Sequence, residues 1–144
     1  MHALDRLRTV AAGGSTAGDR LRVVVADVVV LCALIVAGEL RHQINPVEQP
    51  LVLAETAVPF LLGWAVVATL VGAYGERALA DRIWSVRTAV GGWLGAVAIG
   101  AILRGSPYFA GAIPWTFLAV MAGLGTVALA LVRFVAVTLL SSTR

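Results

Sequence analysis

The chain has 144 residues, of which 60% are hydrophobic, and its mean hydropathy is +0.92. Soluble domains contain roughly 45–50% apolar residues, so this composition excludes an ordinary soluble domain and predicts an integral membrane protein. The net charge is +3, but the eleven arginines form no basic stripe interleaved with aromatic side chains, so we expect no nucleic-acid partner.

Residues 1–22 form a separate and more polar tail. Leu4, Leu7 and Val10 recur at helical spacing with charged residues between them, which is typical of a short interfacial helix. The glycine-rich segment that follows, as far as Gly18, has the composition of a linker. A frayed polar tail is the alternative interpretation.

Four apolar runs fill most of residues 23–144, and each exceeds the roughly 18 residues that mark a membrane-spanning helix. The predicted spans cover about 23–40, 51–74, 83–103 and 114–140. The connecting loops are short and contain proline or glycine. Consecutive helices should therefore lie antiparallel, which predicts an all-α, up-down four-helix bundle.

The arginines predict how this bundle is oriented. They concentrate in the N-terminal tail and in the second loop, at Arg77 and Arg82, whereas the first and third loops contain only Arg41 and Arg104. Because cytoplasmic loops carry the excess of positive charge, both termini should be cytoplasmic.

The first span contains a carboxylate, Asp27. At the centre of a membrane helix such a group costs roughly 2.5–3.5 kcal/mol, which the surrounding Val, Leu and Ile offset, but it still requires a partner or a proton. The helical period places Asp27 on a stripe that leads to Glu39, Arg41 and His42 at the outer end. The alternative is that Asp27 simply snorkels to the inner interface.

The outer ends of the helices gather more ionisable residues. Glu55 lies one turn before Pro59, and a proline inside a helix frees a backbone carbonyl that must be satisfied elsewhere. We expect an outer cluster made up of Glu39, Arg41, His42, Glu55 and Arg104. The alternative is that these are interfacial charges in contact with lipid headgroups.

Small residues mark a packing surface on the third span. Gly91 and Gly95 form a GxxxG motif, and Gly92, Ala96 and Gly100 continue at four-residue steps. Such faces let helix backbones approach closely. The sequence leaves open whether the close contact is made within the bundle or with a second copy of the chain.

Arg133 is the deepest cation and lies in the cytoplasmic half of the fourth span, as Asp27 does in the first. Charges at membrane depth face protein or water, so the two residues should form a buried pair. One interpretation of such a pair is purely structural. The other interpretation is a functional role, because desolvation often cancels the attraction between buried charges and such a pair then adds little stability.

Signals for other chemistry are poor. Two histidines and one cysteine provide no metal-ligand spacing, and the chain contains no nucleophile motif, phosphate loop or haem motif. We therefore expect no metal, no cofactor and no catalytic residue.

Several short motifs mark the apolar runs: Gly38-x-x-x-His42, Pro59-Phe60 with Gly63-Trp64, Trp93, Gly100-x-x-x-Arg104 and Arg133. In their order and spacing these motifs resemble a family of small prokaryotic integral membrane proteins known only as a domain of unknown function (DUF). The resemblance spans roughly residues 23–135 and implies four helices in the cytoplasmic membrane of a prokaryote, with no established activity. The family pattern has Arg after the glycine of the first helix, where this chain has Glu39, which reverses a charge in the outer cluster.

Two functions fit these residues. The first is a small oligomeric channel or carrier for an ion or small polar solute, in which the outer cluster recruits the solute and the Asp27–Arg133 region gates its path. The second is a non-catalytic accessory or assembly subunit of a larger membrane complex. Both hypotheses imply the lipid bilayer as a partner, together with either a second copy of the chain or another membrane protein.

Overall fold

The computed structural model describes residues 17–109 and 114–143 of the chain. Within these ranges there is no strand, and four helices are long and apolar enough to cross a membrane. In chain order the helices are α2 (Ala17–Arg41), α3 (Pro50–Leu70), α4 (Glu76–Ala80), α5 (Arg82–Arg104) and α6 (Trp115–Ser142). The predicted all-α, multi-pass membrane fold is confirmed.

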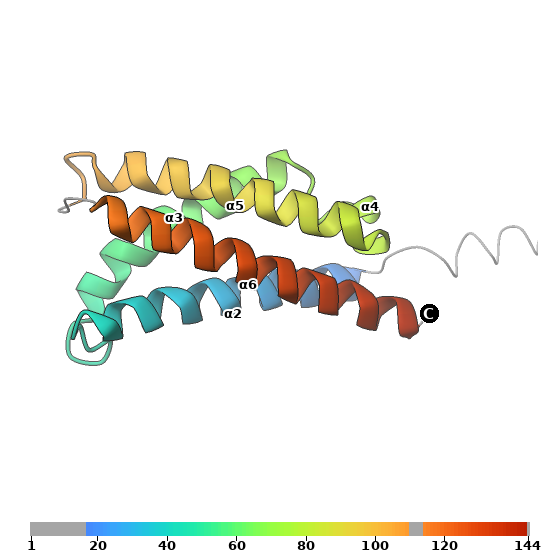
Figure 1. Cartoon of the computed structure of the whole chain (residues 1–144), viewed down its shortest axis with the longest axis horizontal. Coiled ribbons are helices and arrows are strands. Elements are labelled where there is room, and N and C mark those ends of the chain that lie inside the picture. The colour runs from blue at the N-terminus through green and yellow to red at the C-terminus, as the bar shows by residue number, and fades with distance from the viewer. Residues whose placement is uncertain (1–16, 110–113, 144) are drawn as a thin grey trace, which may run out of the picture.

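Consecutive long helices run in opposite directions along the molecule, as Figure 1 shows. α5 packs against both α3 and α6, and α2 closes the bundle by packing against α6 and α3. The start of α2, the short α4 and the end of α6 lie together at one end, and the α2–α3 loop lies at the other. We name these the inner and the outer end, after the predicted orientation.

Two helix boundaries differ from the sequence prediction by more than two residues. α2 begins at Ala17 rather than Val23, so the last part of the predicted tail is helical. α3 ends at Leu70 rather than Tyr74, because Gly72 adopts a positive φ of 68° that turns the chain. The predicted interfacial helix in the first part of the tail lies outside the described residues.

The short helix α4 follows this turn and was not predicted, since five residues are too few to show an apolar period. The next helix begins at a side-chain cap. The Asp81 carboxylate accepts hydrogen bonds from the backbone N–H groups of Ile83 at 2.9 Å and Trp84 at 3.1 Å. The Arg77 guanidinium lies 3.8 Å from the centroid of the Trp84 ring, which links α4 to α5.

Glycines allow α3 and α5 to approach closely. A Cβ atom added at Gly63 would lie 2.6 Å from the carbonyl oxygen of Ala96, and one added at Gly100 would lie 2.6 Å from the Phe60 ring. Neither position can hold a larger residue unless the two helices shift. The contact therefore depends on glycine from both helices.

The predicted small-residue face of α5 is thus used within the bundle. Gly92, Ala96 and Gly100 are buried, and Gly95 lies against α3. Gly91 differs: it is exposed, and an added Cβ would meet nothing within 4 Å. Because Gly91 faces away from α3, it does not contribute to packing inside the bundle, and its contact with a second copy stays a prediction.

Candidate functional site

Two stripes of residues direct ionisable side chains into the bundle. On α2 every fourth residue is buried, namely Val23, Asp27, Leu31, Ile35 and Glu39. On α6 Arg133 occupies the same kind of stripe, between Leu129 and Val137. A four-residue step keeps side chains on one face of a helix. Asp27 therefore faces protein and does not snorkel to the interface.

Asp27 and Arg133 form a fully buried ion pair, and both side chains are 0% exposed. Arg133 Nη2 donates to Asp27 Oδ2 at 2.7 Å, and Arg133 Nε donates to Oδ1 at 3.0 Å and to Oδ2 at 3.1 Å. The remaining nitrogen, Nη1, donates to the carbonyl oxygen of Ala73 at 2.6 Å and to Ser85 Oγ at 3.4 Å. The predicted pair is confirmed, and its forked geometry is that of a strong Arg–carboxylate contact.

Tyr74 provides the carboxylate with a further donor. Its hydroxyl donates to Asp27 Oδ2 at 2.8 Å and accepts from the indole N–H of Trp64 at 2.9 Å. Tyr74 lies in the turn after α3, outside the membrane spans, and burial together with the Asp27 carboxylate raises the pKa of its hydroxyl, which therefore stays protonated. We call this group the inner cluster: Asp27, Trp64, Ala73, Tyr74, Ser85 and Arg133.

The roles of Tyr74 and Ser85 in this cluster were not predicted from the sequence. Neither side chain costs much in a membrane helix, so neither stood out as Asp27 and Arg133 did. Tyr74 follows the turn at Gly72, and this turn brings its hydroxyl within hydrogen-bonding distance of Asp27 on α2. The available signal was weak: a polar aromatic residue two positions after a glycine at the end of an apolar run.

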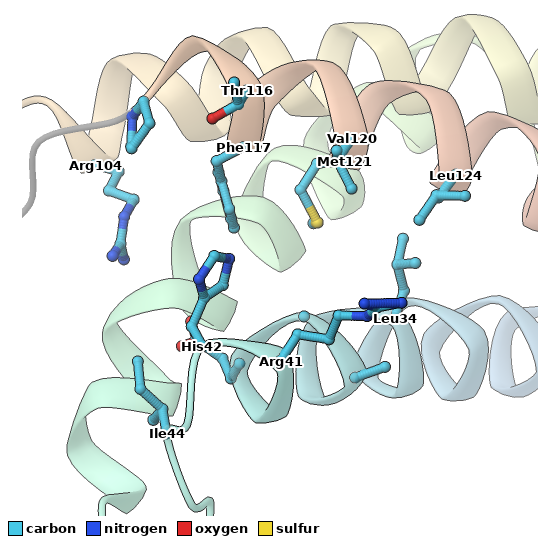
Figure 2. Close-up of a pocket in the computed structure, with 14 residues that line it drawn as sticks. Leu34, Arg41, His42, Ile44, Arg104, Thr116, Phe117, Val120, Met121 and Leu124 are labelled. Atoms are coloured by element: carbon cyan, nitrogen blue, oxygen red, sulfur yellow. The ribbon is translucent and has the colours of Figure 1, made fainter.

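A pocket of about 700 Å³ lies at the outer end, between α2 and α6 and beside the end of α5. We call it the outer pocket. In Figure 2 the side chains of Arg104, His42 and Phe117 point toward a common space from different parts of the chain. Apolar side chains that include Leu34 and Met121 form much of the rest of its wall. A concave, largely apolar site with a few polar groups is the usual form of a small-molecule site.

Four of the five predicted outer-cluster residues line this pocket: Glu39, Arg41, His42 and Arg104. Arg104 Nη1 is buried and has no hydrogen-bond partner in the described part of the chain. Glu39 is only 7% exposed, and its carboxylate makes no ion pair with any described residue. Arg41 and His42, by contrast, are exposed, so contact of these two residues with headgroups stays an alternative.

The fifth residue, Glu55, is not part of this site. It is exposed on α3, whereas Thr56, Pro59 and Phe60 face the bundle. Position 55 precedes Thr56 by one residue, or about 100° around the helix, which turns its carboxylate outward. The prediction that Glu55 joins the outer cluster was wrong, although Pro59 does lie inside the helix and is buried.

Apolar residues separate the outer pocket from the inner cluster. Leu31 and Ile35 follow Asp27 along α2, and Leu129 precedes Arg133 on α6, and all three are buried. No three His, Cys, Asp or Glu side chains in the described ranges gather closely enough to hold a metal ion.

Comparison with known protein families identifies one that matches this chain. The model of DUF3054, a protein family of unknown function, matches residues 24–136. The chain belongs to this family. The matched range of DUF3054 includes every residue of the inner cluster and all four ionisable residues of the outer pocket. No curated protein and no solved structure matches the chain, so its function has to be argued from the geometry of the two sites.

Proposed function

We propose that this DUF3054 protein is a small carrier rather than an enzyme, and that it takes up a small polar solute across the cytoplasmic membrane of a prokaryote. The observation that carries the proposal is the outer pocket, which holds a buried and unpartnered guanidinium nitrogen of Arg104 within the part of the chain that is described.

The free energy of solute binding in this pocket depends on Arg104 Nη1. A buried donor without a partner costs roughly 1–3 kcal/mol, and more when the group is charged. The described contacts of Arg104 do not recover this cost. A solute that accepts a hydrogen bond from Nη1 would recover this cost on binding.

The inner cluster would serve as the inner gate. At the inner end the Asp27–Arg133 pair joins α2 to α6, whereas at the outer end the pocket separates these helices. Transport would require α2 to move relative to α6, so that the ion pair opens as the outer pocket closes. A buried ion pair suits such a two-state contact, because its attraction is largely offset by desolvation.

The second candidate function is that of an accessory or assembly subunit, and the face of α5 that is turned away from the bundle favours it. Gly91 and Leu94 are exposed there, and there is open space at the Gly91 Cβ position. Another membrane helix could approach this face closely. In the carrier proposal its occupant is a second copy of the chain, and in the accessory proposal it is a different membrane protein.

Flux in liposomes tests the carrier proposal. Purified protein is reconstituted, and the movement of protons, alkali cations, small anions and small zwitterions is followed. We expect flux of at least one class, lost in Arg104→Gln and retained in Glu55→Gln, the matched control at an exposed position. No flux of any class, together with a co-purifying protein that is released by Gly91→Leu, would instead support the accessory subunit.

A further inference from the structure

Three charged residues line the outer pocket. Arg41 is exposed, whereas the other two, Glu39 and Arg104, are opposite charges that reach into the pocket and do not pair with each other. Glu39 reaches it from the inward face of α2, and Arg104 reaches it from the last turn of α5. Within the described ranges neither side chain takes part in an ion pair. Two helices therefore hold a carboxylate and a guanidinium in one pocket without bringing them into contact.

Charge balance narrows the ligands that such a pocket can take. An anion bound at Arg104 would leave the nearly buried Glu39 carboxylate without a partner and would add a like charge beside it. A cation bound at Glu39 would leave Arg104 Nη1 unpartnered. Both groups are satisfied only if the ligand has one charge of each sign, because an uncompensated buried charge is costly.

We propose that the outer pocket binds a small zwitterion, with a cationic amine directed to Glu39 and a carboxylate or phosphate directed to Arg104. This inference names the solute class of the proposed carrier and rests on that proposal only for the transport step. The planar guanidinium of Arg104 matches the geometry of both anionic groups. Arg41, in the same wall, adds positive charge.

The apolar part of the wall suits the rest of such a ligand. Phe117, Met121 and Leu34 line the pocket together with Glu39 and Arg104. Its volume of about 700 Å³ falls within the roughly 300–1,000 Å³ of small-molecule sites. It can therefore hold an apolar substituent as well as the two charged groups. Free amino acids and the headgroup of phosphatidylethanolamine share this chemistry, and they differ in whether acyl chains are attached.

Binding measurements on the purified full-length protein in detergent distinguish recognition of the ligand's charges from recognition of its shape. Titration calorimetry is performed with each protein amino acid and with dihexanoyl phosphatidylethanolamine. Each amino acid that binds is then compared with its deaminated acid and its decarboxylated amine, which for leucine are 4-methylpentanoate and 3-methylbutan-1-amine. We expect the zwitterion to bind at least roughly tenfold more tightly than either singly charged analogue, since each analogue leaves one buried charge unpaired.

Two variants assign the two ends of the ligand. Glu39→Gln should weaken zwitterion binding roughly tenfold or more and leave the affinity for the deaminated acid unchanged or higher. Arg104→Gln should also weaken zwitterion binding roughly tenfold or more, but it should leave the affinity for the decarboxylated amine unchanged or higher. Glu55→Gln, at an exposed position of α3, should change neither affinity. Thermal melts of each variant show whether it is folded.

The outcomes of the binding and flux measurements distinguish this inference from the carrier proposal. Zwitterion binding without flux supports the site and contradicts the carrier. Binding of the phosphatidylethanolamine alone supports the site and identifies a lipid headgroup as its ligand. The inference is overturned if no zwitterion binds, or if a singly charged analogue binds as tightly, even when liposomes show flux of a simple ion.

Discussion

At the scale of single residues, Arg133 shows how a full charge is accommodated within a membrane bundle. Its Nε, Nη1 and Nη2 atoms all donate to protein oxygens, and the carboxylate of Asp27 receives two of the three. The sequence predicted this pair because both charges interrupt apolar runs at similar depth. It could not predict the contributions of Ala73 and Ser85, since they depend on how the turn after α3 and the start of α5 lie against α6.

Removing either charge of the buried pair should destabilise the protein severely. In Asp27→Asn or Arg133→Gln the remaining charge stays in a dry site without its partner, which costs roughly 3–5 kcal/mol. We expect a large drop in the melting temperature in detergent, whereas Arg87→Gln, at an exposed arginine, should have little effect. The double variant Asp27→Arg with Arg133→Asp should recover part of the loss.

The recovery should be incomplete, because an arginine at position 27 no longer donates to the carbonyl of Ala73 or to Ser85 as Arg133 does. Purely additive losses in the double variant, with no recovery, would show that the two charges do not interact in the folded protein.

At the scale of helices, the apolar runs predicted all four spans, because length and composition alone decide whether a helix can cross a membrane. They could not decide which face of each helix turns inward. Glu55 is the clearest case: its depth fits the outer cluster, but its position on α3 directs it away from the bundle. Gly91 is the corresponding case on α5, where the GxxxG motif has only one of its two glycines against α3.

The α3–α5 contact yields a matched pair of alanine variants. Gly63→Ala places a methyl group 2.6 Å from the Ala96 carbonyl oxygen, so the helices must separate and the melting temperature should fall clearly. Gly91→Ala places the same group in open space. Because alanine favours helix over glycine by roughly 0.5–1 kcal/mol, Gly91→Ala should be neutral or stabilising. Equal melting temperatures for the two variants would contradict the described packing.

At the scale of the whole molecule, the fold has a polar site at each end and an apolar layer between them. The order of helices followed from short loops and was predictable. The outer pocket was not, because it depends on how α2 and α6 diverge while the ion pair holds their inner halves together. The sequence did indicate which residues would gather there, with the exception of Glu55.

The orientation of the bundle is testable by labelling from one side. In a Cys32→Ala background, a cysteine at Gln49 should react with an impermeant thiol reagent added outside intact cells, and one at Ala80 should not. Both positions are exposed, one in the α2–α3 loop and the other at the end of α4. The asymmetry of arginine between loops is the physical basis. The opposite labelling pattern would reverse the inner and outer ends.

The central claim of the carrier proposal is that the outer pocket is reached from outside and that the inner end of the bundle stays closed. Labelling of Leu34→Cys, at the α2 wall of the pocket, tests this most directly. In the Cys32→Ala background we predict reaction with an impermeant reagent from outside only. We predict reaction from both sides in Asp27→Asn, measured at a temperature at which the melt of that variant shows it to be folded. The neighbouring Ala33→Cys, which faces away from the bundle, should stay unreactive in the lipid. Equal reaction of Leu34→Cys from both sides without the Asp27 change, or no reaction from outside, would contradict the account.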